Sequence, residues 1–228
     1  MGDISVNEAS SIYLNFRQVS ACKRLFRTGR TQDDFVHADV LAANRITSFL
    51  DLRNLTSDQI AANVKGYQER GIHYISMPVI DGSAAKLLKG EVTESSYVQY
   101  YLIMFETNIN RFRQIFITLC HENYYNLLIG CNFGKDRTGV LVYLFLKILD
   151  IDESEIYADY VESSKYLGSC SWLRKLYPEK QDLAFNPTSN IIQAFDKGIM
   201  SQYGNNSNLA RVLGLTYNDI VILKGKHL

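Results

Sequence analysis

The chain has 228 residues, of which 46% are hydrophobic and 21% charged, and its 24 basic residues balance its 24 acidic ones. A balanced charge gives no general attraction to nucleic acid or anionic membranes, so we expect no nucleic-acid partner, and any affinity for phosphate must be built locally. The length suits one well-buried core, and no repeat or Pro/Gly-rich linker divides it, so we expect a single domain over residues 1–228.

The first half of the chain alternates strand and helix signals. β-rich runs predict strands, and amphipathic runs between them predict helices. The predicted strands are Ile12–Phe16, Arg24–Arg27, Ile46–Leu52 and Ile72–Pro78, and the predicted helices are Asp34–Asn44 and Ser57–Arg70. Thr56 or Ser57 is expected to cap the second of these helices, and Gly71 to end it.

The second half opens with an apolar repeat from Ser95 to about His121, which predicts one long helix. The apolar run Asn126–Gly130 then predicts a short buried strand. Four further helices are predicted, at Thr138–Leu149, Asp152–Leu167, Pro187–Tyr203 and Thr216–Lys224. The alternation favours an α/β fold, with a mostly parallel central sheet, helices on both of its faces and extra C-terminal helices.

The spacing of the cysteines and the first residues of the chain indicate the cellular compartment in which the protein is expected. The four cysteines, Cys22, Cys120, Cys131 and Cys170, lie far apart without a CxxC pair, which indicates neither a disulfide framework nor a zinc site and favours a reducing cytoplasm. The first residues lack the segments of a signal peptide, and no apolar run is long enough to span a bilayer. We therefore expect a soluble, cytoplasmic protein. The sequence carries no signal for its oligomeric state.

Residues 131–139 read Cys-Asn-Phe-Gly-Lys-Asp-Arg-Thr-Gly and join the predicted buried strand to the predicted helix that follows it. Ligands of parallel sheets bind at the carboxyl ends of strands, which is the place of this loop. Free main-chain N–H groups and a helix start both favour a bound anion there. The residues expected to bind phosphate are Asn132, Phe133, Gly134, Lys135, Asp136 and Arg137.

The residue types in this loop suit attack on a phosphoryl group. A positive surrounding stabilises a thiolate, so Cys131 is the candidate nucleophile. Arg137 has a planar guanidinium that can bind two phosphate oxygens, and Gly134 permits a tight turn. Thr138 can donate its hydroxyl to the cysteine sulfur or cap the helix start. None of the other three cysteines has an arginine six positions later.

The loop resembles the Cys-x5-Arg signature of protein tyrosine and dual-specificity phosphatases. More narrowly, Gly-Lys-Asp-Arg-Thr-Gly is similar to a microbial tyrosine-phosphatase group whose members can also act on phosphoinositides. Further segments agree in order, so that the resemblance covers roughly residues 12–165; they are Asn15-Phe16-Arg17, Leu25-Phe26-Arg27-Thr28-Gly29, Asp51-Leu52-Arg53, Met77-Pro78 and Asp159-Tyr160.

This resemblance implies a metal-independent phosphomonoesterase that forms a cysteinyl-phosphate intermediate and needs no cofactor. The implied partner is a phosphorylated protein or a phosphoinositide, with phosphotyrosine as the first substrate and phosphoserine or phosphothreonine as further ones. Independently of the resemblance, the helical pattern predicts a helical C-terminal part over residues 168–228, and its position in the chain suggests a lid over the pocket. No histidine of the chain has metal-ligand spacing, so we expect no metal.

Gly130 departs from the resemblance, because the family usually has a histidine directly before the catalytic cysteine. That histidine helps to hold the loop and activate the thiol, so a second hypothesis is a phosphate-binding pseudophosphatase of weak activity. The presence of Cys131, Arg137 and Thr138 together favours the enzyme. A third hypothesis, a sulfurtransferase or an arsenate reductase, is disfavoured by the Lys-Asp-Arg-Thr-Gly continuation.

Several roles stay open between two interpretations. The general acid is either Asp81, which follows a strand as the mobile-loop aspartate of related phosphatases does, or Asp136 inside the loop, and we favour Asp81. Asp81 could instead be a turn residue before Gly82. Lys135 either binds a second phosphate or is a solvated lysine at the rim. Three arginines either line the pocket or support it from outside, namely Arg17, Arg27 and Arg53.

Overall fold

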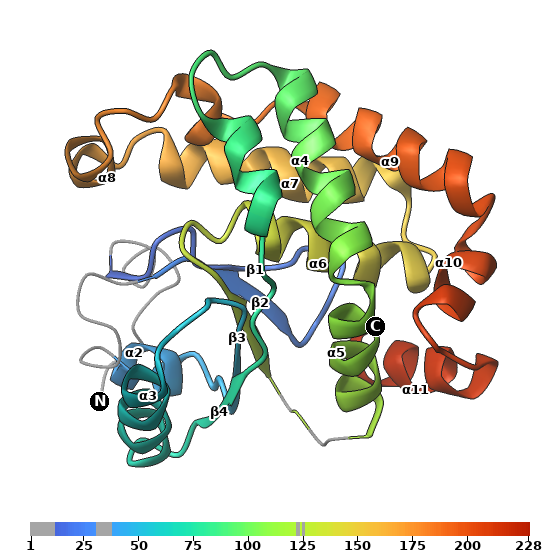
Figure 1. Cartoon of the computed structure of the whole chain (residues 1–228). Helices are drawn as coiled ribbons and strands as arrows, with labels where there is room; N and C mark the ends of the chain where they lie inside the picture. Colours follow the sequence, from blue (N-terminus) through green and yellow to red (C-terminus); the bar gives the residue numbers. More distant parts are fainter. Residues whose placement is uncertain (1–11, 31–37, 122–123, 125) are drawn as a thin grey trace.

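The computed structural model describes residues 12–30, 38–121, 124 and 126–228, which form an α/β fold (Figure 1). Its strands make one sheet in the order β1-β2-β5-β3-β4. Their bounds are Arg17–Gln18 (β1), Leu25–Thr28 (β2), Ser48–Asp51 (β3), His73–Ser76 (β4) and Leu127–Gly130 (β5). β1 runs antiparallel to β2 and all other pairs are parallel, which confirms the predicted, mostly parallel sheet.

Helices cover both faces of this sheet (Figure 1). The α-helices are α2 (Ala38–Ala43), α3 (Ser57–Gln68), α4 (Glu94–Thr107), α5 (Ile109–His121), α6 (Asp136–Ile148), α7 (Glu153–Leu167), α8 (Ser171–Leu176), α9 (Ser189–Tyr203), α10 (Asn206–Val212) and α11 (Tyr217–His227). Among the residues that the structure describes, the 3₁₀ turns are η2 (Gly82–Leu88) and η3 (Asp182–Ala184). No helix within the described part of the chain is long and apolar enough to cross a membrane.

Among the described residues, the central strand β5 lies between the two largest of three apolar clusters, and the third cluster surrounds Phe133 of the loop. Successive side chains of a strand point to opposite faces, so Leu128 packs into a smaller core with α2 and α3, while Leu127 and Ile129 pack into a larger one. The larger core takes residues from α4 to α7 and from α9 to α11. Because both faces are buried, the whole strand is apolar, which explains why its sequence shows no alternation.

The predicted strand at Ile12–Phe16 is wrong, because the chain turns there. The N–H of Phe16 donates to the carbonyl of Tyr13 at 3.1 Å, and Asn15 has a left-handed φ of 57°. Asparagine is one of the few residues that adopt this conformation readily. The strand is instead Arg17–Gln18. Part of the predicted helix Asp34–Asn44 lies outside the described residues, and the described part is α2.

The single helix predicted from Ser95 to about His121 is two helices, which meet at Asn108. The side-chain amide of Asn108 binds the main chain of Ile80. Its Oδ1 accepts a hydrogen bond from the N–H of Ile80 at 3.0 Å, and its Nδ2 donates one to the carbonyl of Ile80 at 2.7 Å. The apolar repeat continues across the break, because both helices bury a face in the same core. Asn108 thereby fixes the segment that carries Asp81.

Candidate active site

The loop of residues 131–135 lies at the carboxyl end of β5, the middle strand of the sheet. It follows β5, whose last residue, Gly130, pairs with Thr28 of β2 and Asp51 of β3, and it runs into α6. Gly134 has a left-handed φ of 63°, and a Cβ on it would lie 2.4 Å from the carbonyl carbon of Thr28. Glycine is therefore required there, and the loop packs directly against the end of β2.

A cavity of about 200 Å³ opens above this loop. It brings together four of the predicted catalytic residues, Cys131, Arg137, Asp81 and Asp136. Cys131 is 3% exposed and Arg137 8% exposed, so both lie at its base. The remaining lining residues come from four separate segments of the chain; they are Ala85, Leu88, Tyr100, Asn132, Phe133, Tyr177 and Lys180.

Arg137 places a guanidinium group in the cavity. Burial by itself acts to lower the pKa of Arg137, but negative charge on neighbouring groups, Cys131 foremost, raises it above its ordinary value. Its Nη1 atom donates to the carbonyl of Leu52 at 3.3 Å, which holds the guanidinium in place. Among the described residues, none accepts a hydrogen bond from the main-chain N–H groups of residues 132–135. These amides are available to bind a phosphate.

The two candidate acids differ in their partners. Asp81 accepts a hydrogen bond from the hydroxyl of Tyr100, through Oδ2 at 3.0 Å. Asp136 accepts one from the hydroxyl of Tyr101 through Oδ1 at 2.7 Å, and the same oxygen lies 3.3 Å from Nζ of Lys135. Asp136 is therefore tied to the protein interior, whereas Asp81 is held at the cavity wall by one neutral donor.

Lys135 lies in the interior, so the interpretation as a solvated rim lysine is wrong. Its side chain is fully buried, and Nζ donates to the carbonyl of Leu183 at 3.0 Å and lies 4.2 Å from the centre of the Tyr97 ring. Burial lowers the pKa of Lys135, although the adjacent Asp136 opposes this shift. The side chain does not line the cavity, so a phosphate-binding role falls to its main-chain N–H.

Phe133 and Thr138 have surroundings that the sequence did not reveal. The ring of Phe133 packs edge-on against Tyr177, with 5.2 Å between ring centres, and also contacts Phe185. Thr138 is fully buried, and within the described residues its hydroxyl has no hydrogen-bond partner. Neither the hydrogen bond to the sulfur of Cys131 nor the side-chain cap at the helix start is formed in this structure, and a role for Thr138 in the reaction stays a proposal.

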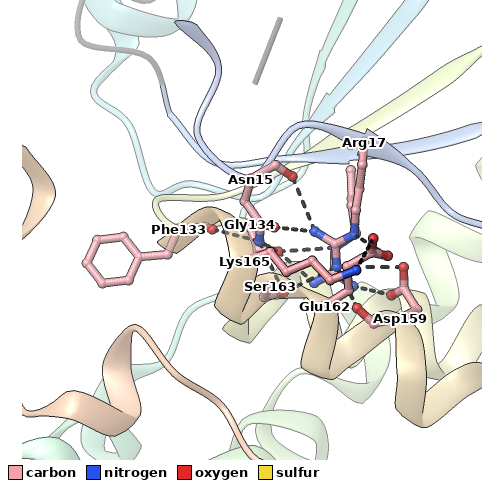
Figure 2. Close-up of polar contacts among 9 residues, drawn as sticks. Asn15, Arg17, Phe133, Gly134, Asp159, Glu162, Ser163 and Lys165 are labelled. Atoms are coloured by element: carbon pink, nitrogen blue, oxygen red, sulfur yellow. Dashed lines mark hydrogen bonds and ion pairs between the residues drawn. The ribbon is translucent and has the colours of Figure 1, made fainter. Parts of the chain in front are cut away.

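The three arginines outside the loop are buried, and the described residues lining the cavity do not include them. Arg53 pairs with Asp51, through Nη2 and Oδ2 at 2.7 Å, which fixes the end of β3. Arg17 and Arg27 instead form ion pairs with Asp159 of α7. Figure 2 shows Arg17 and Asp159 close to the loop residue Gly134. The interpretation as supporting residues is the one these contacts favour.

Sequence reasoning did not single out Asn15, Tyr100 or Asp159 as site residues. Asn15 and Asp159 belong to segments that carry the family resemblance, and this membership is the sequence signal that could have identified them. Tyr100 belongs to an apolar helix face, where the sequence offers no such signal. Across the described residues, no group of three or more His, Cys, Asp or Glu side chains gathers as a metal-ion site would require.

Comparisons with known proteins place the chain in the tyrosine and dual-specificity phosphatase superfamily. The model of the tyrosine phosphatase family matches residues 15–228, and the chain belongs to this family. A Cupriavidus necator protein provisionally named a tyrosine-protein phosphatase is 26% identical over 152 residues, which are 62% of this chain and 54% of that protein. The chain thus matches about half the length of this curated relative.

Two solved structures have a partial similarity to the chain at low sequence identity. The core catalytic domain of the PP-IP phosphatase SIW14 from S. cerevisiae, in complex with citrate, is 17% identical, with a TM-score of 0.44 over 83% of this chain and 93% of that one. TpbA from P. aeruginosa is 10% identical, with a TM-score of 0.42 over 89% of this chain and 92% of that one.

Proposed function

We propose that the protein is a metal-independent phosphomonoesterase that works through a cysteinyl-phosphate intermediate, with phosphotyrosine as its main substrate. The observation that carries the proposal is that Cys131, Arg137 and Asp81 line one cavity, beside loop amides that no described residue engages. Membership of the tyrosine phosphatase family supports the reaction class.

In the first step, the thiolate of Cys131 attacks phosphorus, so that an S–P bond forms as the P–O bond to the leaving group breaks. Asp81 gives its proton to the leaving oxygen. Arg137 and the loop N–H groups stabilise the charge on the other three phosphate oxygens, which is usually the largest contribution to such a step.

In the second step, water attacks phosphorus and passes a proton to the carboxylate of Asp81. The S–P bond breaks, inorganic phosphate leaves, and the thiolate of Cys131 is restored. We assign the hydroxyl of Thr138 to the departing sulfur, since this buried hydroxyl has no partner among the described residues.

Asp81 is the better candidate for the acid. A proton donor must reach the leaving oxygen, which points out of the cavity, and Asp81 lies on the wall formed by η2 rather than in the loop. One oxygen of Asp136 is already occupied by Tyr101 and Lys135. We assign Asp136 to the support of the loop.

The walls of the cavity suit an aromatic substrate. Tyr100, Phe133 and Tyr177 line it together with Leu88, and Cys131 lies at the base, where a phosphate on a ring can reach it. Residues 168–228 contribute Tyr177 and Lys180, and this supports a lid role for that part of the single domain. Phosphoserine, phosphothreonine and phosphoinositides are the substrates to compare.

One assay tests the proposal against the pseudophosphatase alternative. Hydrolysis of an aryl phosphate is measured in a chelating buffer, with and without vanadate, for the wild type and Cys131→Ser. We expect turnover in the wild type that vanadate inhibits and that the serine variant lacks. Vanadate binding without turnover would select the pseudophosphatase. Activity that needs a metal or survives in Cys131→Ser would contradict the proposal.

A further inference from the structure

We infer that Arg27 and Asn15 are positioning residues of the phosphate loop, which hold two of its carbonyls on the side away from the phosphate and so aim the next two N–H groups at it. The inference rests on the proposed function, because it assumes that the loop binds a phosphate. Neither residue touches the cavity, so both would act through the main chain of the loop.

The contacts converge on two consecutive carbonyl groups. Arg27 donates to the carbonyl of Gly134 from Nη2 at 2.6 Å and from Nε at 3.2 Å. The Nδ2 group of Asn15 donates to the carbonyl of Gly134 at 3.0 Å and to that of Phe133 at 3.2 Å. Both donor side chains are fully buried, so water does not compete for these hydrogen bonds.

Because peptide groups are planar, the directions of these two carbonyls also determine the directions of the N–H groups that follow them. In a trans peptide the carbonyl of one residue and the N–H of the next point in opposite directions, and no peptide bond in the described chain is cis. Carbonyls of Phe133 and Gly134 that face Arg27 and Asn15 therefore turn the N–H groups of Gly134 and Lys135 away from them. Among the described residues, neither N–H has an acceptor.

The two donors are themselves fixed. Arg27 forms an ion pair with Oδ2 of Asp159, and Arg17 donates to Oδ1 of Asn15. This last bond decides the orientation of the amide, because it leaves Nδ2 of Asn15 to face the loop. Figure 2 shows Asn15, Arg17 and Asp159 gathered behind the loop, with the Phe133 ring pointing away from them.

Burying the charged side chains of Arg17, Arg27 and Asp159 costs desolvation free energy, which argues that these residues have a role other than stabilising the fold. Burial and the nearby positive charge of Arg27 lower the pKa of Arg17 to about 10, against the opposing effect of Asp159. Arg17 also lies 3.5 Å, through Nε, from a carboxylate oxygen of the partly exposed Glu162. Burying two guanidinium groups around Asp159 is still at best weakly stabilising compared with apolar packing. Preorganised N–H donors, by contrast, are the kind of feature that accelerates phosphoryl transfer.

The test compares Arg27→Met and Asn15→Asp with Lys147→Met. Asn15→Asp replaces the donor by an oxygen in a side chain that still tolerates the left-handed backbone. Lys147 is the matched control, because it is a buried cation that pairs with Asp196 at 3.0 Å within the helical layer. Within the described residues, its ion pairs are with Asp196 and Glu153 and do not involve the loop. Thermal unfolding, vanadate inhibition, kcat and KM are measured for each.

We expect Arg27→Met and Asn15→Asp to bind vanadate roughly tenfold or more weakly than the wild type and to lose kcat by a similar factor. The reason is that loss of a preorganised N–H donor weakens the binding of both the anion and the transition state. Lys147→Met should lose comparable thermal stability with vanadate affinity unchanged. If Arg27→Met fails to fold, Arg27→Lys takes its place, because it keeps the charge opposite Asp159 but not the fork of donors.

Vanadate affinity like that of the wild type in folded Arg27 and Asn15 variants would overturn the inference. So would an equal loss of affinity in Lys147→Met, since the effect would then follow stability alone. A wild type that binds vanadate without turnover contradicts the proposed function but leaves this comparison intact. A wild type that does not bind vanadate removes the basis of the inference as well.

Discussion

Gly130 lies directly against Phe49, and a Cβ on Gly130 would come within 2.7 Å of Cε2 of that ring and 2.9 Å of the methyl group of Thr28. The ring cannot give way easily, because Tyr67 and Tyr74 pack against it edge-on, with centres 5.3 and 5.7 Å away. Phe49 thus fills the space into which the family's histidine would extend. Gly130 and the Phe49 ring of β3 are therefore complementary in shape, and the glycine leaves no gap at the start of the loop.

The first prediction is that Gly130→Ala destabilises the fold by about 1–3 kcal/mol, because one added methyl group overpacks the contact with Phe49. Urea unfolding followed by circular dichroism measures this. The matched control is Gly225→Ala in α11, where a Cβ would meet open space, and which should raise stability by about 0.5–1 kcal/mol. Equal stability of Gly130→Ala and the wild type would show that Phe49 does not restrict this position.

The second prediction concerns the acid. Asp81→Asn should lower kcat/KM by about 10²–10⁴ for an aryl phosphate with a poor leaving group, because the leaving oxygen then departs without a proton. The loss should shrink for a good leaving group, which needs no acid. Steady-state kinetics on phenyl and nitrophenyl phosphates measure both effects.

The Asp136→Asn variant is measured on the same two aryl phosphates, for comparison with Asp81→Asn. It keeps an oxygen for the hydroxyl of Tyr101, so it should lower activity by a factor that is the same for both leaving groups. A leaving-group dependence in Asp136→Asn but not in Asp81→Asn would exchange the two roles. No dependence in either variant would mean that both assignments are wrong.

The sequence predicted the parts of the fold that local patterns control. The apolar run ending at Gly130 and the loop after it indicated a central parallel strand with an anion site, because both signals lie in consecutive residues. Of the two residues expected to cap α3, Thr56 is the N-cap, and Gly71, which was expected to end the helix, has a left-handed φ of 73°. Periodicity did not reveal the break at Asn108, since that residue is fixed by Ile80, far away in the chain.

Contacts between distant segments also explain what was missed at the site. Nothing near Lys135 in the sequence indicates that its ammonium binds the carbonyl of Leu183, 48 residues away. The segments that Asn15 and Asp159 come from carried the family resemblance, but Arg17 links the two residues behind the loop only because of the way β1 and α7 pack. The turns η2 and η3 and the short helices α8 and α10 were not predicted, because seven or fewer residues carry little periodic signal.

The third prediction distinguishes two roles for Lys135. Lys135→Met keeps the length and apolar stem but leaves the carbonyl of Leu183 without its donor, so we expect a stability loss of about 1–3 kcal/mol. Activity should fall equally for substrates with one phosphate and with two, because the ammonium lies outside the cavity. Kinetics on a singly and a doubly phosphorylated inositol lipid headgroup measure the ratio. A selective loss on the doubly phosphorylated substrate would show that Lys135 binds a second phosphate.

The fourth prediction is a pH dependence of stability that comes from His227. Its side chain is 2% exposed and packs edge-on against Phe145, with 4.9 Å between ring centres. Burial, helped by the positive charge of Lys226 and Arg24, lowers the pKa of His227 from 6.5 to about 4. The folded state therefore binds fewer protons than the unfolded state between these two values, so stability is fully present above pH 6.5 and is lost as the pH falls toward 4.

The expected loss over this pH window is about 3 kcal/mol, at about 1.4 kcal/mol for each tenfold change in proton affinity. Urea unfolding at pH 7.5, 5.5 and 4.5 measures the free energy of unfolding for the wild type and for His227→Leu. The leucine variant cannot take up the proton, so its free energy of unfolding should fall less over the same window, although buried carboxylates such as Asp196 still contribute. Parallel pH profiles for the two proteins would show that His227 is protonated in the folded state without penalty.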